Sequence, residues 1–195
     1  MNIHGAVLAG GKSSRYGRQK MFEAYHGLPL YQYSVQALKQ GGADSIYIVT
    51  NRKLAPRFAE NEGEILLEDT PYQGPLPALA LALKQLQKDS WVFLLAADIP
   101  FISAEFVKKL IENADSGEID AVIPVSGGRV HPLHGLYHQC CLSSALMLIG
   151  EGKAGMYPLL QKVRTSYVPF PDEQKDFINI NRPEDWPPAE KEQEE

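Results

Sequence analysis

The residues best suited to chemistry lie between Leu8 and Lys20, in the segment LAGGKSSRYGRQK. Gly10 and Gly11 follow an apolar run, and glycine lets a backbone approach a ligand closely or adopt positive φ. Successive amides in such a turn can form an anion-binding nest. Side chains of the same segment add hydrogen-bond donors and positive charge, namely Ser13, Ser14, Arg15, Arg18 and Lys20. The segment therefore predicts a loop that binds a highly charged anion such as a nucleoside triphosphate.

Two common phosphate-binding loops do not match this segment. A Walker A loop needs Gly-Lys-Ser/Thr at its end, whereas Gly17 is followed by Arg18. A dinucleotide fingerprint needs G-x-G-x-x-G, whereas the glycines here fall at positions 10, 11 and 17. A glycine-rich connector with solvated basic residues is the alternative, and the density of donors disfavours it.

A second candidate residue is Asp98, which follows the apolar run Trp91–Ala97. In open α/β sheets, ligands bind beyond the carboxyl ends of the strands. Mg²⁺ prefers one or two carboxylates together with phosphate oxygens and water, so one well-placed aspartate suffices. Asp98 could instead cap a helix, but Ser103 is the more natural cap for a helix that begins at Ala104. We therefore expect Asp98 to bind magnesium.

Three histidines and two cysteines resemble metal ligands at first sight. If residues 130–137 form a strand, His134 and His138 share a face and His131 faces away, which does not favour a zinc site. Cys140 and Cys141 are adjacent, and neighbours in sequence make an awkward disulfide. Reduced thiols predict a cytoplasmic location.

Apolar runs rich in Ile, Val and Leu alternate with amphipathic stretches along the chain. The expected strands are Ile3–Leu8, Ser45–Thr50, Glu64–Leu67, Trp91–Ala96, Ala121–Pro124, Val130–Tyr137 and Ser166–Phe170. The expected helices are Leu30–Gln40, Pro75–Gln87, Ala104–Ala114, Leu142–Ile149 and Gly155–Lys162. Continuous apolar strands are typical of a mostly parallel sheet buried on both faces. The pattern predicts a three-layer α/β/α sandwich with a mostly parallel, Rossmann-like sheet.

Composition limits the partners that we expect. The 195 residues carry a formal net charge of -5, which argues against sequence-independent binding of nucleic acid. No apolar run approaches the length of about 18 residues that a membrane span needs. We expect one domain over residues 1–186, followed by a polar, disordered tail over residues 187–195 (PPAEKEQEE).

The first loop resembles a family signature. LAGGKSSRYGRQK is similar to the L-A-G-G-x-S-x-R-M-G-x-D-K pattern of the molybdenum cofactor guanylyltransferases, the MobA family. Four further segments resemble that family in the same order, namely GPLPALALAL, LLAADIPFI, HPLHGLY and FININRPEDW. The resemblance covers nearly the whole chain and implies a sheet of the nucleotide-diphospho-sugar transferase type. The double glycine is similar to guanylyltransferases, whereas related cytidylyltransferases usually show L-A-A-G.

The resemblance also implies roles for individual residues. It places the guanine nucleotide on Leu8, Ala9 and Gly10, mainly through backbone, with Gly11 completing the loop. It places Arg15 and Lys20 on the phosphates, with Lys20 the better catalytic candidate, and magnesium on Asp98. Further nucleotide contacts are implied for Asn51 and Asp69, and acceptor-side roles for Asn179 and Asn181, whose amides would point the same way on a strand. An ordinary turn is the alternative interpretation of Asn51 and of Asp69.

The chain departs from the family pattern at two places. Gln19 replaces a usual aspartate, which removes a carboxylate near the phosphate loop. Pro77 and Ala78 replace the usual Ala-Gly of G-P-L-A-G, which removes a glycine that allows close backbone approach.

The resemblance implies a reaction between GTP and molybdopterin-bound molybdenum cofactor. The products would be the guanine dinucleotide form of the cofactor and pyrophosphate, and proteins that deliver the cofactor would be transient partners. CTP-dependent or sugar-1-phosphate nucleotidyl transfer is the alternative within the same chemistry. A non-catalytic protein that binds nucleotide or molybdopterin, and an α/β scaffold without a nucleotide, are the alternatives outside it.

Overall fold

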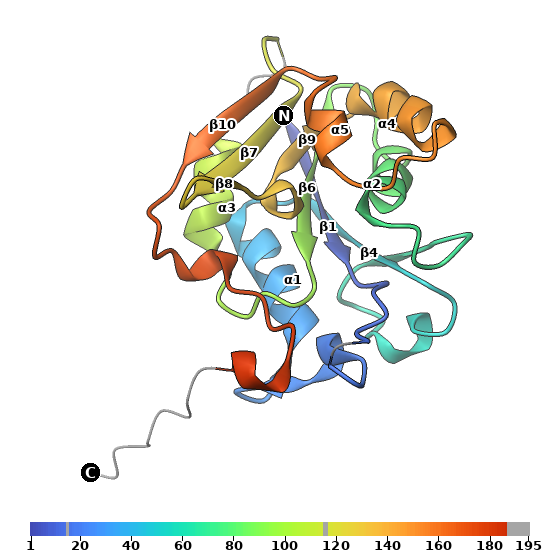
Figure 1. Cartoon of the computed structure of the whole chain (residues 1–195), viewed down its shortest axis with the longest axis vertical. Coiled ribbons are helices and arrows are strands. Elements are labelled where there is room, and N and C mark those ends of the chain that lie inside the picture. The colour runs from blue at the N-terminus through green and yellow to red at the C-terminus, as the bar shows by residue number, and fades with distance from the viewer. Residues whose placement is uncertain (15, 115–116, 187–195) are drawn as a thin grey trace.

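The computed structural model describes residues 1–14, 16–114 and 117–186. In this part of the chain a central sheet lies between two layers of helices (Figure 1). The sheet contains β1 (Asn2–Leu8), β4 (Ser45–Thr50), β5 (Glu64–Leu67), β6 (Ser90–Ala96), β7 (Ala121–Ser126), β8 (Arg129–Val130), β9 (Leu136–His138) and β10 (Thr165–Pro169). A separate hairpin contains β2 (Ala24–Tyr25) and β3 (Leu28–Pro29). The helices are α1 (Leu30–Gly41), α2 (Pro75–Leu83), α3 (Ala104–Ile111), α4 (Cys141–Gly150) and α5 (Tyr157–Leu160).

Strand order brings the ends of four strands to one edge of the sheet. The order is β10-β7-β9-β6-β1-β4-β5, with β8 paired to β7. β1 pairs in parallel with β4 and β6, and β4 pairs in parallel with β5. β9 is antiparallel to β6 and β7, and β8 is antiparallel to β7. The sheet is thus mostly parallel, which confirms the predicted fold class. The carboxyl ends of β6, β1, β4 and β5 therefore lie side by side.

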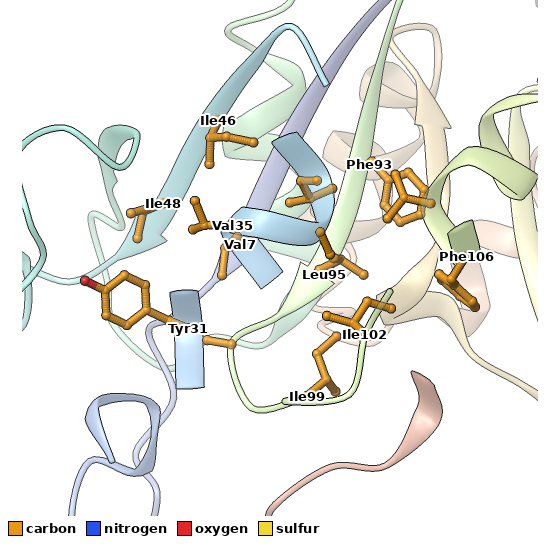
Figure 2. Close-up of a cluster of buried hydrophobic side chains, with 14 of the residues drawn as sticks. Val7, Tyr31, Val35, Ile46, Ile48, Phe93, Leu95, Ile99, Ile102 and Phe106 are labelled. Atoms are coloured by element: carbon orange, nitrogen blue, oxygen red, sulfur yellow. The ribbon is translucent and has the colours of Figure 1, made fainter. Parts of the chain in front are cut away.

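Two hydrophobic cores hold the helices against the sheet. Alternate strand residues face opposite layers, so Val7 and Leu95 point toward α1 and α3, while Ala6 and Leu94 point toward α2 and α4. Figure 2 shows the first core, in which Val35 of α1 lies beside Val7, and Phe106 of α3 lies near Phe93. Burial of both faces explains why these strands are continuously apolar in sequence.

Local signals set the helix ends. Ser103 caps α3, because its Oγ accepts a hydrogen bond from the Phe106 amide at 3.2 Å, as the sequence predicts. Gly42 ends α1 with a left-handed φ of 110°. α2 ends at Leu83 rather than at Gln87. The Gln85 and Leu86 amides donate hydrogen bonds to carbonyls three residues earlier, as in a 3-10 turn, instead of four residues earlier. None of the helices in residues 1–14, 16–114 and 117–186 is long and apolar enough to cross a membrane.

The prediction of one strand over Val130–Tyr137 is wrong. The chain instead forms β8, a 3-10 turn over Pro132–His134, and then β9. Proline has no amide hydrogen to donate to a strand ladder, and Pro132 instead begins the 3-10 turn, where the fixed φ of proline is tolerated. The Tyr137 hydroxyl stabilises the turn by donating to the Pro132 carbonyl at 2.6 Å.

Candidate active site

A cavity of about 430 Å³ opens at the carboxyl edge of the parallel strands. The loop after β1 forms one wall, the segments after β5 and β6 form others, and the C-terminal segment adds one side chain. The polar or glycine residues that line it are Gly10, Gly11, Lys12, Ser13, Ser14, Lys20, Glu68, Tyr72, Gly74, Asp98 and Asn181. The cavity therefore lies where an open α/β sheet is expected to bind its ligand.

The loop after β1 presents free amides and cations to this cavity. The amides of Gly10, Gly11 and Lys12 make no hydrogen bond with any other described residue. Ser13 has a left-handed φ of 50°, and its carbonyl accepts hydrogen bonds from the Tyr16 and Gly17 amides at 3.0 and 3.2 Å. These hydrogen bonds stabilise the turn, and the amides of Gly10, Gly11 and Lys12 remain available to an anion.

Lys20, Asp98 and Asn181 meet inside the cavity. The Lys20 ammonium forms an ion pair with Asp98 Oδ2 and donates a hydrogen bond to Asn181 Oδ1 at 2.9 Å. Both charged side chains are largely buried, with 14% and 15% of their surfaces exposed. Asp98 Oδ1 is buried and has no hydrogen-bond partner among the described residues. A buried carboxylate oxygen without a partner is costly, so this atom is suited to a cation that arrives with a ligand.

Asn51 and Ala9 support the loop instead of lining the cavity. Asn51 is buried, and its Oδ1 accepts hydrogen bonds from the Lys53 and Leu54 amides at 3.1 and 3.3 Å. Ala9 is buried as well, and its carbonyl accepts a hydrogen bond from Thr50 Oγ1 at 2.9 Å. Of the expected nucleotide-binding residues, the cavity is lined by Leu8, Gly10, Gly11, Lys20 and Asp98.

The carboxylate that enters the cavity after β5 belongs to Glu68 rather than to Asp69. The Glu68 amide donates to the Thr50 carbonyl at 2.8 Å, which prolongs the pairing of β5 with β4 by one residue. Neighbouring side chains of an extended segment point to opposite sides, so Glu68 turns inward and Asp69 is exposed. Burial raises the pKa of the Glu68 carboxyl. No pattern in the sequence distinguishes Glu68 from its neighbour Asp69 as the residue that faces the cavity.

The remaining expected residues differ in whether they line the cavity. Asn181 lines the cavity, whereas the half-buried Asn179 does not. No strand forms over residues 178–181, so the two amides are not held on one strand face. Arg15 lies outside the described residues. The Gln19 side chain braces the loop through Ser13 Oγ and the Lys12 carbonyl, both at 3.5 Å, and it is not among the residues that line the cavity.

The three histidines lie in different surroundings. His131 stacks on Phe177 with ring centroids 4.0 Å apart, and His138 packs on Trp91 with centroids 5.0 Å apart. His134 is buried, and burial lowers the pKa of its imidazole to about 3. Within residues 1–14, 16–114 and 117–186, no group of three or more His, Cys, Asp or Glu side chains could hold a metal ion.

A glycine-rich anion loop that faces a strand-end aspartate and a lysine, on a mostly parallel α/β sheet, defines a protein of the nucleotide-binding α/β class. Comparison with known proteins narrows this class. Residues 5–167 match the family described as the MobA-like NTP transferase domain. The chain therefore belongs to the MobA-like NTP transferase family and is a nucleotidyltransferase.

Individual relatives agree with this assignment. A "probable molybdenum cofactor guanylyltransferase" of Halalkalibacterium halodurans is 38% identical over 188 residues, which cover 93% of this chain and 94% of that protein. A protein of the same name from Geobacillus sp. (strain WCH70) is 31% identical over 93% of this chain and 95% of its own length. The solved structure of molybdopterin-guanine dinucleotide biosynthesis protein A from Archaeoglobus fulgidus is similar in fold, with a TM-score of 0.75 and 22% identity over 93% of this chain and 94% of that one.

Proposed function

We propose that this enzyme transfers GMP from GTP to molybdopterin-bound molybdenum cofactor, with Mg²⁺, and releases pyrophosphate. The observation that carries the proposal is the meeting of Lys20, Asp98 and Asn181 opposite the free amides of the glycine loop. The names of the relatives at 38% and 31% identity support the choice of nucleotide and acceptor. The free thiols of Cys140 and Cys141 agree with a reducing cytoplasm, where cofactor-delivery proteins would act as transient partners.

The donors in the cavity fit a magnesium ion that is bound together with a triphosphate. They are oxygens, which Mg²⁺ prefers, and the buried Oδ1 of Asp98 has no hydrogen-bond partner in the part of the chain that the structure describes. One carboxylate leaves most coordination positions to phosphate oxygens and water, as is usual for this ion. When bound, Mg²⁺ would neutralise charge on the triphosphate and orient it.

The side chains would then act by alignment and charge neutralisation. A phosphate oxygen of the acceptor attacks the α-phosphorus, and a new P–O bond forms as the bond to the β-phosphate oxygen breaks. The electron pair of the broken bond leaves with pyrophosphate. Phosphate is already a nucleophile, so Lys20 acts by stabilising negative charge and no strong base is needed. The amides of Gly10 and Gly11 would hold the leaving phosphates.

The ion pair of Lys20 with Asp98 suggests how the site changes when GTP binds. Lys20 satisfies Asp98 Oδ2 before the nucleotide arrives. A bound triphosphate would attract the Lys20 ammonium, and the Asp98 carboxylate would then be free to hold a cation. Charge in the buried site would thus remain balanced in both states.

The decisive experiment combines calorimetry with a pyrophosphate assay. We expect GTP with Mg²⁺ to bind more tightly than CTP or ATP, and pyrophosphate to appear only when molybdopterin-bound cofactor is added. Stronger binding and turnover of CTP would indicate the cytidylyltransferase alternative. GTP binding without pyrophosphate release would indicate a non-catalytic binding protein, and the absence of heat with all three nucleotides would refute the proposal.

A further inference from the structure

The free amides of the glycine loop are useful to a ligand only if they point into the cavity. Gly10 and Gly11 line the cavity, and their amides make no hydrogen bond with any other described residue. Glycine has a wide choice of backbone conformations, so these two residues do not set the direction of their own amides. The side chains that contact the carbonyls of the loop are therefore the ones that can set it.

Thr50 fixes the direction of the Ala9 carbonyl. The pairing of β1 with β4 ends where the Ala9 amide donates to the Val49 carbonyl at 2.8 Å. Thr50 Oγ1 then donates to the Ala9 carbonyl at 2.9 Å, and the Thr50 side chain is fully buried. Water does not compete for a hydroxyl at this depth, so the bond holds the carbonyl toward the end of β4.

The planar peptide passes this direction on to Gly10. In a trans peptide, the carbonyl of one residue and the N–H of the next lie in one plane and point to opposite sides. The described residues contain no cis peptide bond. Because the Ala9 carbonyl is turned toward the buried Thr50, the Gly10 amide points the other way, toward the cavity that Gly10 lines.

Asn51 acts in the same way on the next peptide. Its Nδ2 lies 3.5 Å from the Gly10 carbonyl, which is a long hydrogen bond. Its Oδ1 accepts hydrogen bonds from the Lys53 and Leu54 amides, which fixes the orientation of the side-chain amide. A Gly10 carbonyl that is turned toward Asn51 directs the Gly11 amide away from it. The end of β4 thus orients two successive amides of the loop.

We infer that Thr50 is a positioning residue, whose hydroxyl turns the Gly10 amide toward the bound nucleotide and so strengthens nucleotide binding. Asn51 assists it at Gly11. This inference rests on the proposed function and adds the residues that preorganise its glycine loop. Both side chains are buried and neither lines the cavity, so they act through the backbone. An amide that already faces its ligand loses little freedom on binding, which is why preorganisation raises affinity.

Thr50→Val tests the inference, because it removes the hydroxyl and keeps the shape of the side chain. Calorimetry with GTP in saturating Mg²⁺ should show binding weakened about threefold to tenfold, the range for one hydrogen bond. Thr50→Ser retains the hydroxyl and should stay within about twofold of wild type. Ser126→Ala is the matched control. Ser126 is also buried, and its Oγ donates to the Pro171 carbonyl at 2.7 Å, but it does not line the cavity.

The melting temperature separates positioning from general stability. Thr50→Val and Ser126→Ala should both melt at a lower temperature than wild type, because each removes a buried hydroxyl that donates to a carbonyl. Only Thr50→Val should bind GTP more weakly. Wild-type affinity in folded Thr50→Val, or an equal loss of affinity in Ser126→Ala, overturns the inference.

Nuclear magnetic resonance of protein labelled with ¹⁵N-glycine would observe the loop amides directly. In wild type, GTP with Mg²⁺ should move the Gly10 and Gly11 amide proton resonances downfield, because each proton gains a hydrogen-bond acceptor. In Thr50→Val the Gly10 shift should be smaller. An unchanged Gly10 resonance in wild type that binds GTP overturns the inference and leaves the proposed function intact. If wild type binds no nucleotide, the proposed function and this inference fail together.

Discussion

Lys20 and Asp98 are the residues on which catalysis should depend most. Lys20→Ala and Asp98→Ala should each lower the rate of pyrophosphate release about a hundredfold or more, because each removes a charge contact at the reacting phosphates. Single-turnover assays with saturating GTP and cofactor would measure the effect. Arg18→Ala is the matched control, because Arg18 pairs with Glu23 at the surface and its side chain is 71% exposed. Near-wild-type rates in both cavity variants would contradict the assignment.

His134 should make the fold sensitive to acid. Burial lowers its pKa to about 3 in the folded state, compared with about 6.5 in the unfolded chain. The unfolded chain therefore binds a proton first as pH falls below 6.5, and stability decreases between pH 7 and pH 5. His134→Leu should remove up to about 2 kcal/mol of this decrease. Urea unfolding of wild type and of His134→Leu at pH 7 and pH 5 would measure the change in the free energy of unfolding. An equal decrease in the two proteins would refute the prediction.

The sequence predicts a residue of the cavity where the order of the strands alone determines its position. Asp98 follows a buried central strand, and the edge to which such a strand leads can be inferred without a structure. The choice between Glu68 and Asp69 could not be inferred, because it depends on whether β5 pairs with β4 for one residue more. The contact between Lys20 and Asn181 joins residues 161 positions apart, and no local pattern predicts it.

At the scale of elements, continuous apolar runs predicted the core strands well. The expected bounds of β4 and β5 match the structure, and those of β1 and β6 differ by one residue at the start. The hairpin of β2 and β3 was not predicted, because two-residue strands carry no periodic signal. Its turn places His26 and Gly27 at φ of 43° and 80°, and histidine is a weaker turn signal than asparagine.

Close packing of α1 on β1 should depend on Gly5. A Cβ at this residue would lie 2.7 Å from Ile46 Cδ1 and 2.8 Å from Leu38 Cδ1. Gly5→Ala should therefore destabilise the fold by about 1–3 kcal/mol, as overpacking of a dense core usually does. Urea unfolding would measure the loss. The double variant Gly5→Ala/Ile46→Val removes one colliding methyl group and should lose less than the sum of its single variants; strict additivity would show that this contact is not responsible.

At the scale of the whole molecule, the C-terminal segment returns to the N-terminal loop beside the cavity. Figure 1 shows the red C-terminal turn next to the blue N-terminal segment. Trp186 stacks on Tyr25 with ring centroids 5.2 Å apart, and its Nε1 donates to the Tyr16 hydroxyl at 2.9 Å. Asp185 accepts a hydrogen bond from the Asn181 amide at 2.7 Å. Both ends of the described chain therefore contribute to the position of the site.

This arrangement predicts that Trp186 holds the cavity in its binding geometry without contributing to the main cores. Trp186→Ala removes both the stacking and the hydrogen bond, and should raise the KM for GTP roughly fivefold to tenfold. Trp186→Phe retains an aromatic ring for Tyr25 and should show a smaller increase. Steady-state kinetics would give KM and kcat. The free energy of unfolding, measured with urea, should change by less than about 1 kcal/mol, because Trp186 lies outside both cores. A wild-type KM in Trp186→Ala would show that the glycine loop and Lys20 keep their positions without the C-terminal segment.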